Sequence, residues 1–346
     1  MAPKILITRN VGPEAMAKLE ATDFELIVNP VDGEPTRAWV LEKVADPEVI
    51  AACIMHGQPS DKVDREFLDA ASPNLKVVST FSVGFDHIDV PYANSKGIKI
   101  GHTPGVLSNA VADTTVMLVL MTMRRVEEGI RLIKDNEWPN LPWAPFVMCG
   151  PAIGHPNLTI GFLGFGRISE CVVERLLSFT SKTAPPTILY SNSRARDNQA
   201  AIDAEFSSRF GVKVARADKD DVAAKSDIVI VLCSQSPATI YLVNADFLKK
   251  MKKTAVLVNA ARGPIVNSED LAAALDAGEI FGAGLDVITG EPKVYADHPL
   301  VKHPKCVVIP HMGSADYDTR NAMADLCVSN AIAGATGQPL IAEVKV

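Results

Sequence analysis

"TIGFLGFGRISECVVERL", residues 159–176, is an apolar run that passes through three glycines and continues with the spacing of a helix. An apolar run followed by a glycine turn and a helical pattern is typical of a strand–turn–helix unit. Gly164 permits a tight turn, Gly166 lets the backbone approach a phosphate, and a helix over 167–178 offers N–H groups to an anion. Ser169 stands where a third glycine usually serves helix packing. The turn alone therefore fits either a dinucleotide site or an ordinary strand–helix junction.

The end of the next apolar run, "LYSNSRAR" at residues 189–196, bears on this choice. Proteins that bind NAD place Asp or Glu here to accept the ribose hydroxyls. This chain instead has Asn192 and Ser193, followed by Arg194 and Arg196. Without a carboxylate there is no repulsion toward a 2′-phosphate, and a guanidinium can bind that phosphate through two hydrogen bonds. The segment predicts NADP (NADPH) as the cofactor.

Two series of apolar runs separated by helix-like segments indicate two parallel sheets. The first series comprises residues 4–8, 24–28, 51–55, 75–80 and 98–102. A second series, of seven strand candidates, opens at residue 158, and a helix over 315–334 follows it. Because the second sheet begins in mid-chain, it predicts an inserted domain, with the first segment and the tail together forming the other domain. A chain of 346 residues is also long for a single core.

Composition and charge exclude several classes of function. A net charge of −7 argues against a broad surface for nucleic acid or for an anionic membrane. No apolar stretch reaches the length of about 18 residues expected of a membrane span. The six cysteines are scattered without a CxxC pair, so we predict no metal site, no disulfide framework and a reducing, cytoplasmic location. The start of the chain lacks the pattern of a signal peptide.

Polar residues follow three strand candidates of the second series. Arg262 lies in "VNAARG", Asp286 and Glu291 lie in "GLDVITGEP", and His311 lies in "IPHMGSAD". Parallel strands end at the same edge of a sheet, where doubly wound folds bind ligands. There Arg can bind a carboxylate and polarise a ketone, His can donate a proton, and Glu can orient the His. Each of these residue types, taken alone, more often has a structural role, but together they suit the reduction of a 2-keto acid.

The chain resembles the D-isomer-specific 2-hydroxyacid dehydrogenases. The runs "GFGRI", "VNAARG", "GLDV…EP" and "PHMGSA" match the signatures of that family in order and spacing, as does "STFSVGFDHIDV" at residues 79–90. The likeness covers essentially the whole chain. It implies two doubly wound α/β domains, with a Rossmann NADP-binding domain at 107–314 inserted into a flavodoxin-like substrate (catalytic) domain formed by 1–106 and 315–346.

The resemblance also implies the roles of individual residues. The catalytic set would be Arg262, Glu291 and His311. The substrate would meet Val83, Gly84, Arg262, Ser314 and Trp143, and Val83 and Gly84 would bind its carboxylate through their backbone. The cofactor would be bound by Gly164, Gly166, Arg167, Ile168, Asn192, Ser193, Arg194, Arg196, Ser234, Ala260, Asp286 and Gly313.

Within the family the chain is most similar to the glyoxylate/hydroxypyruvate reductases, through "STFSVGFDHID", "SNSRAR", "CSQSPAT" and the segment with Trp138 and Trp143. This implies NADPH-dependent reduction of glyoxylate or hydroxypyruvate to glycolate or D-glycerate, with His311 as the proton donor. Two alternatives stay open: an NAD-linked dehydrogenase of another D-2-hydroxy acid, and a dinucleotide-sensing corepressor that binds proteins. Ser169, Asp316 and the "VITGEP" loop depart from the usual family pattern, and the loop leaves the preferred 2-keto acid open.

The segment "NEWPNLPWAPFVMCGPAIGHPN", residues 136–157, is rich in Pro and Trp. Its prolines prevent a regular helix, and long irregular stretches within compact domains usually serve a function. Tryptophans anchor interfaces. We expect a homodimer in which an arm at about 124–157 and one long helix over 109–130 cross between subunits. The alternative is an arm that folds back on its own domain. By resemblance, Trp143 would reach the partner's active-site mouth.

Overall fold

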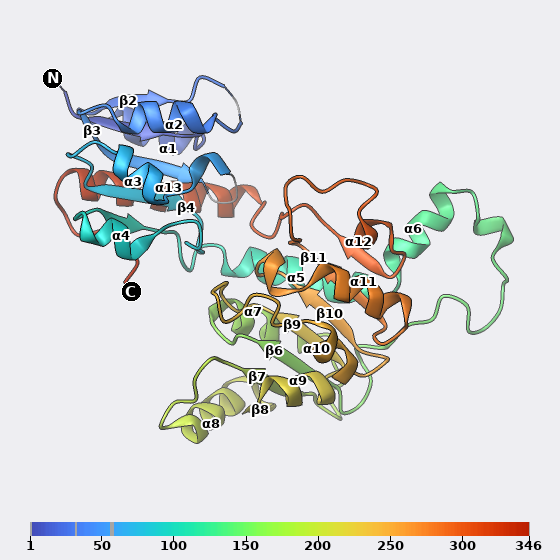
Figure 1. Cartoon of the computed structure of the whole chain (residues 1–346). Coiled ribbons are helices and arrows are strands. Elements are labelled where there is room, and N and C mark those ends of the chain that lie inside the picture. The colour runs from blue at the N-terminus through green and yellow to red at the C-terminus, as the bar shows by residue number, and fades with distance from the viewer. Residues whose placement is uncertain (1, 32, 56–58, 346) are drawn as a thin grey trace. The chain divides into compact units, whose positions relative to one another are not determined.

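The computed structural model describes residues 2–31, 33–55 and 59–345 (Figure 1). These residues form two compact units, Met1–Leu107 with Ser314–Val346, and Ser108–Gly313. Each unit is built on a parallel sheet, so the predicted fold class of two doubly wound α/β domains is confirmed. The roles assigned to the units, substrate binding and NADP binding, stay predictions.

The first unit has a five-stranded sheet in the order β2-β1-β3-β4-β5. Alternate residues of β1 face opposite cores, as expected of a sheet covered on both faces: Ile5 and Ile7 pack on one side and Leu6 on the other. The strands are β1 (Lys4–Ile7), β2 (Glu25–Val28), β3 (Val49–Met55), β4 (Val77–Phe81) and β5 (Lys99–Gly101). The helices are α1 (Pro13–Glu20), α2 (Arg37–Val44), η1 (Pro59–Asp61), α3 (Arg65–Ala70), α4 (Val90–Ser95) and α13 (Tyr317–Ala335).

The C-terminal helix α13 returns to this first sheet and lies against it. Its Gly334 sits so close to β4 that a Cβ atom there would lie 2.5 Å from the Cβ atom of Val77. The buried residues Val328 and Ala331 of the same helix join the core formed by β1 and β3. The tail of the chain is therefore an integral part of the first unit.

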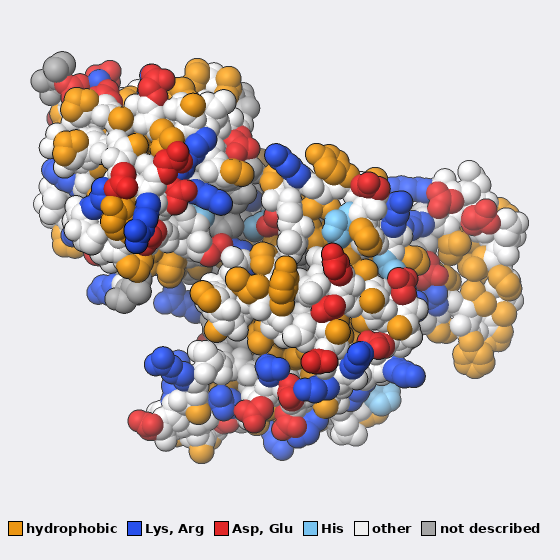
Figure 2. All heavy atoms as spheres, viewed as in Figure 1, with side chains coloured by type: hydrophobic (Ala, Val, Ile, Leu, Met, Phe, Trp, Pro, Cys, Tyr) orange, Lys and Arg blue, Asp and Glu red, His pale blue; other side chains and the backbone are white. Residues whose placement is uncertain are grey.

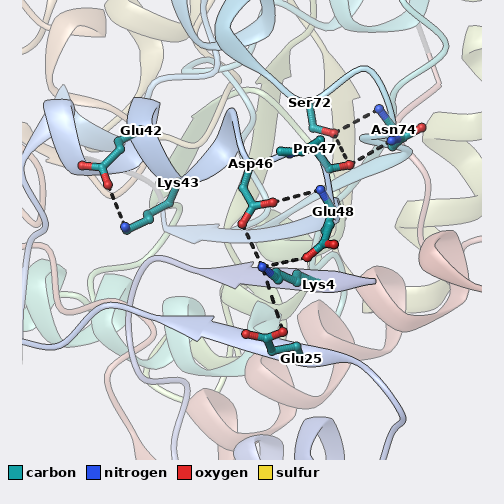
Figure 3. Close-up of polar contacts among 9 residues, drawn as sticks. All are labelled: Lys4, Glu25, Glu42, Lys43, Asp46, Pro47, Glu48, Ser72 and Asn74. Carbon is teal, nitrogen blue, oxygen red and sulfur yellow. Dashed lines mark hydrogen bonds and ion pairs between the residues drawn. The ribbon is translucent and has the colours of Figure 1, made fainter. Parts of the chain in front are cut away.

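A cluster of charges joins the amino-terminal ends of β1, β2 and β3 (Figure 3). Lys4 Nζ lies 2.9 Å from Glu48 Oε2, 3.0 Å from Asp46 Oδ2 and 4.0 Å from Glu25 Oε2. Hydrogen bonds to Glu48 and then to Asp46 raise the pKa of Lys4 above its usual value. The backbone N–H of Glu48 and the Lys4 ammonium lower the pKa of Asp46. Ion pairs thus occupy the amino-terminal edge of this sheet. Val83 and Gly84 follow β4 at the opposite, carboxyl-terminal edge.

The second unit has a seven-stranded parallel sheet in the order β12-β11-β10-β9-β6-β7-β8. All seven strand candidates of the second series form its strands: β6 (Thr159–Leu163), β7 (Thr187–Ser191), β8 (Lys213–Arg216), β9 (Ile228–Val231), β10 (Val256–Asn259), β11 (Gly282–Leu285) and β12 (Cys306–Val308). The other elements are α5 (Ser108–Met123), α6 (Val126–Lys134), η2 (Trp138–Asn140), α7 (Arg167–Leu176), α8 (Gln199–Phe210), α9 (Lys219–Lys225), α10 (Ala245–Lys250), η3 (Gly263–Ile265), α11 (Ser268–Asp276) and α12 (Pro299–Lys302). Strand β6 lies between β7 and β9. The strand order reverses here, because β7 and β8 follow on one side of β6 and β9 to β12 follow on the other.

The prediction of one long helix over 109–130 is wrong. Helix α5 ends at Met123, because Arg125 adopts a left-handed conformation with φ of 52°. The Arg125 guanidinium donates two hydrogen bonds, of 2.7 and 2.8 Å, to Glu128 in the first turn of α6. Apolar spacing runs unbroken across this turn and does not report a single left-handed residue.

Helix α6 and the segment after it extend from the rest of the second unit (Figure 1). None of the nine residues of α6, all of which the structure describes, is buried. The following segment forms only one short 3₁₀ turn, at Trp138–Asn140, in agreement with its prolines. Trp143 is 97% exposed and Phe146 is 89% exposed. Figure 2 shows the apolar side chains gathered on this segment.

Arg131 anchors α6 to the body of the unit. Its guanidinium donates hydrogen bonds to the backbone carbonyls of Val301 and Lys302, at the end of α12. Cationic side chains are favourable at the carbonyl end of a helix. Arg131 thus attaches α6 to the end of α12, and the segment that follows α6 is largely exposed.

No helix in the described part of the chain combines the length and apolar character needed to cross a membrane.

Candidate active site

The glycine turn of the opening motif lies between β6 and α7. Gly164 has φ of +89°, and a Cβ atom there would lie 2.5 Å from the backbone nitrogen of Cys233. Only glycine fits both the conformation and the space. Around Gly166 there is no atom within 4 Å of a Cβ position, so the turn is open on that side. Arg167 and Ile168 begin α7, where backbone N–H groups have no acceptor within the helix. These features fit the diphosphate of a dinucleotide.

Ser169 compensates for the missing third glycine. Its side chain is buried, and its hydroxyl donates a 3.0 Å hydrogen bond to the carbonyl of Gly164. The serine therefore stabilises the turn at the position where a glycine would only make room. Gly161 has a separate role in packing, because a Cβ atom there would lie 2.2 Å from Ser226 Oγ.

The segment after β7 is tied to the glycine turn. Asn192 Oδ1 accepts a 2.8 Å hydrogen bond from the N–H of Phe165, and the carbonyl of Ser191 accepts one from Gly164 at 2.8 Å. The side chains of the next predicted residues, Ser193, Arg194 and Arg196, are exposed. Asn192 thus positions the turn through its amide, a role that its place in the motif does not reveal.

His311 and Glu291 come together although twenty residues separate them. His311 Nδ1 lies 2.9 Å from Glu291 Oε1, and Glu291 Oε2 accepts a 3.2 Å hydrogen bond from the N–H of Ile288. The carboxylate is therefore held by its own loop and in turn orients the imidazole ring. His311 has φ of 49°, an uncommon conformation for a residue with a side chain and one that clusters at functional sites.

Asp286 holds the loop that carries His311. Its carboxylate accepts hydrogen bonds of 2.7 Å from the N–H of Met312 and 3.0 Å from that of Gly313. Burial raises the pKa of Asp286, whereas the N–H group of Met312 acts in the opposite direction. The backbone carbonyl of Asp286 also accepts the N–H of His311 at 2.8 Å. This residue, predicted to face the cofactor, is thus a support of the histidine loop.

Arg262 lies at the same edge of the sheet, just after β10. The buried side chain of Asn259 donates to the carbonyl of Arg262 at 2.9 Å and accepts the N–H of Ala261 at 3.1 Å. The next residue, Gly263, packs on the loop after β11, because a Cβ atom there would lie 2.3 Å from the carbonyl carbon of Ile288. The loops of Arg262 and Glu291 are therefore in direct contact. Sequence reasoning missed Asn259, although it lies within the "VNAARG" run.

In the first unit, Val83 and Gly84 form a turn after β4. Both of their carbonyls are engaged: His102 Nδ1 lies 3.0 Å from the carbonyl of Val83, and Ser82 Oγ donates to that of Gly84 at 2.7 Å. Thr80 Oγ1 lies 2.8 Å from Ser82 Oγ and extends the network. These contacts fix the turn through its carbonyls and suit a role for its N–H groups in binding an anion. Ser82 and His102 were not predicted, and only their place next to the motif could have indicated them.

The remaining predicted residues are placed as follows. The carbonyl of Ser234, after β9, accepts a 2.9 Å hydrogen bond from Thr239, and Ala260 directly follows β10. Ser314 belongs to the first unit, whereas Trp143 lies on the exposed segment after α6. Among the described residues, no three His, Cys, Asp or Glu side chains gather as a metal site would require.

The family of the chain follows from comparison with known proteins. Residues 116–313 match the family model described as D-isomer specific 2-hydroxyacid dehydrogenase, NAD binding domain. The chain belongs to the D-isomer specific 2-hydroxyacid dehydrogenases. As a member of this family it is an oxidoreductase with a nicotinamide dinucleotide cofactor.

Similar members of the family include two mammalian proteins. The chain is 42% identical over 343 residues to the glyoxylate reductase/hydroxypyruvate reductase of Mus musculus, which covers 99% of this chain and 98% of that protein. The human protein of the same name is 39% identical, with the same coverage. Among solved dehydrogenase structures, the NADPH-dependent glyoxylate/hydroxypyruvate reductase of Sinorhizobium meliloti in complex with NADP and malonate is 29% identical, with a TM-score of 0.79, over 99% of this chain and 97% of that one.

The role of Ser169 can be tested by removing its hydroxyl. The Ser169→Ala variant leaves the carbonyl of Gly164 without its donor, and a typical net hydrogen-bond contribution of about 0.5–1.5 kcal/mol predicts dinucleotide binding roughly 2- to 12-fold weaker. The dissociation constant is measured by fluorescence titration. Ser178→Ala, near the other end of α7, is the matched control. Equal affinities of both variants and the unchanged protein would show that the hydroxyl does not support the turn.

Proposed function

We propose that the protein is an NADPH-dependent reductase of glyoxylate or hydroxypyruvate, with glycolate or D-glycerate as the product. The observation that carries the proposal is the 2.9 Å contact between His311 and Glu291 at the edge where the Arg262 loop also ends. The relatives named glyoxylate reductase/hydroxypyruvate reductase support the choice of substrate. Six free cysteines support a reducing, cytoplasmic location.

The side chains divide the work of the reaction. NADPH, when bound, supplies the hydride that is transferred to the 2-keto carbon. Arg262 binds the substrate and polarises its ketone, because its guanidinium stays charged and can donate two parallel hydrogen bonds. His311 gives a proton from Nε2 to the ketone oxygen, since its Nδ1 faces Glu291. The backbone N–H groups of Val83 and Gly84 bind the substrate carboxylate.

Selection of NADPH rests on the segment after β7. Arg194 and Arg196 are exposed there, and no ion pair of either one exists in the described part of the chain. Their charges are thus available to a 2′-phosphate, and no acidic residue occupies the positions of Asn192 and Ser193. Both features favour NADPH over NADH.

We also propose that the protein is a homodimer. Trp138, Trp143 and Phe146 lie on the segment after α6 with exposed fractions of 57%, 97% and 89%. Exposed aromatic side chains in one segment mark interaction sites, and a two-fold dimer is the commonest closed assembly. Most residues of helix α5 are buried, so we centre the proposed interface on the exposed residues after it, and the crossing of α5 between subunits stays a prediction. The arm is therefore α6 and the segment that follows it.

His311→Ala tests the proton donor. Loss of a general acid is expected to lower kcat by roughly 10²- to 10⁴-fold and to leave the dissociation constant of NADPH unchanged. Glu291→Gln keeps the size of the side chain and is expected to cause a smaller loss. Steady-state kinetics with glyoxylate and hydroxypyruvate provide the measurement. A His311→Ala enzyme with more than half of the original kcat would end the assignment.

Replacing Arg194 and Arg196 together by Gln tests the cofactor. Charged hydrogen bonds contribute about 1.5–3 kcal/mol each, so with partial compensation by water we expect NADPH to bind about 2–4 kcal/mol more weakly, or roughly 30- to 700-fold. The affinity for NADH is expected to change little. The control is Arg209→Gln, because Arg209 pairs with Glu170 and Glu174 on α7. Equal losses for NADPH and NADH would show that neither guanidinium meets the 2′-phosphate.

Light scattering tests the assembly, with a particle of twice the chain mass expected at micromolar concentration.

The Trp143→Ala variant tests the effect of this side chain on substrate size. It is expected to remain dimeric and to accept larger 2-keto acids, because a bulky residue at the active-site mouth restricts substrate size. The ratio of kcat/KM values for a series of 2-keto acids gives the measurement. A monomeric mass would contradict the dimer, and an unchanged ratio would limit Trp143 to a role in assembly.

A further inference from the structure

A third arginine lies beside the segment that carries Arg194 and Arg196. Arg216 is the last residue of β8, and the parallel pairing of β7 with β8 places it opposite Tyr190. It therefore reaches the carboxyl edge of the sheet at the level where Ser191 and Asn192 follow. Its Nη2 donates a 3.3 Å hydrogen bond to the carbonyl of Asn192. Arg216 ends β8 and Asn192 directly follows β7, so this contact joins residues that are 24 positions apart in the sequence.

The guanidinium of Arg216 has no counter-ion among the residues that the structure describes. The side chain is half buried, and its Nε is buried without a hydrogen-bond partner. Two neighbouring arginines of the same unit do have acidic partners: Arg209 pairs with Glu170 and Glu174, and Arg175 pairs with Asp113. Withdrawing a charge from water is costly unless an anion compensates it. The position of Arg216 therefore suits an anion supplied from outside the chain.

A single carboxylate positions the backbone around this charge. Asp203 Oδ2 accepts the N–H of Arg216 at 3.0 Å, and its Oδ1 accepts the hydroxyl of Tyr190 at 2.6 Å. Gln199 donates to the same Oδ1 at 2.8 Å, and its own side-chain oxygen accepts the N–H of Arg196 at 3.3 Å. Asp203 thus links the ends of β7 and β8 to the loop of Arg196. It meets the backbone of Arg216 and makes no ion pair with its guanidinium.

We propose that Arg216 is a specificity-determining residue that binds the 2′-phosphate of NADPH together with Arg194 and Arg196. The inference rests on the proposed use of NADPH. The Nη2 of Arg216 donates to the carbonyl of Asn192, and the side chain of Asn192 accepts the N–H of Phe165 in the glycine turn. We assign the remaining Nη donors of Arg216 to the phosphate. A phosphate monoester carries a charge of about −1.5 to −2 at neutral pH, so it compensates more than one of these arginines.

The test replaces Arg216 by Gln and compares four ligands: NADPH, NADH, 2′,5′-ADP and 5′-ADP. Loss of a charged hydrogen bond to the phosphate is expected to weaken NADPH and 2′,5′-ADP by roughly 10- to 100-fold. NADH and 5′-ADP are expected to change by less than about 3-fold, which reflects only the lost support of Asn192. Dissociation constants are obtained by calorimetry and fluorescence titration.

Lys213→Gln is the matched control, because Lys213 is exposed at the other end of the same strand and its loss changes the net charge equally. It is expected to leave all four affinities within about 2-fold, since exposed charges at a distance are screened. Arg216→Lys retains the charge with fewer donors, and an intermediate loss for NADPH is expected. This second variant provides the answer should Arg216→Gln fail to fold.

The outcomes separate this inference from the proposed function. If the unchanged protein prefers NADPH and Arg216→Gln keeps that preference, Arg216 does not meet the phosphate, and the inference alone is overturned. Equal losses for all four ligands have the same consequence, because they indicate support of the fold only. If the unchanged protein does not distinguish NADPH from NADH, the proposed cofactor and the inference are both overturned.

Discussion

The parallel pairing of strands is the constraint on which the candidate site depends. In the second sheet β6, β9, β10, β11 and β12 all run in the same direction, so the loops that follow them leave one edge. Backbone hydrogen bonds then join these loops in sequence: the N–H of Asp286 to the carbonyl of Asn259 at 2.9 Å, and the N–H of His311 to that of Asp286 at 2.8 Å. Arg262, Glu291 and His311 are carried by loops held in this way. An antiparallel sheet would send alternate loops to opposite edges.

Buried and half-buried polar side chains fix the backbone near the predicted residues. Asn259 holds the Arg262 loop, Asp286 holds the loop of His311, and Asp203 joins the ends of β7 and β8. Burying a polar group without partners costs about 1–3 kcal/mol, so each of these groups favours one arrangement of the loop around it. Ser82 and His102 act in the same way on the turn of Val83 and Gly84. The residues proposed to act on substrate or cofactor thus rest on a second set that holds their backbone.

Charge is compensated at one sheet edge of this protein and left uncompensated at another. At the amino-terminal edge of the first sheet, Lys4 is surrounded by Asp46, Glu48 and Glu25, so its charge is locally compensated. At the carboxyl edge of the second sheet, Arg216 has no acid partner among the described residues, although the chain as a whole carries a net charge of −7. A compensated cluster contributes to folding, whereas an uncompensated one is available to a ligand. This difference supports the proposed phosphate site at the carboxyl edge.

The sequence by itself determined the strands, the glycine turn and the family. Strands such as β6 and β9 are short apolar runs next to glycine or charged residues, and those local signals survive without any knowledge of the fold. The motifs with Arg262, Glu291 and His311 were equally readable, because their order and spacing identify the family. The tertiary structure decided what local pattern cannot encode. The left-handed turn at Arg125 divides the helix expected over 109–130, and the hydroxyl of Ser169 replaces a glycine. Arg216 acquires its position only through the pairing of β8 with β7. In each case the deciding contact involves the backbone or a residue distant in the sequence, and hydrophobic periodicity carries no information about such partners.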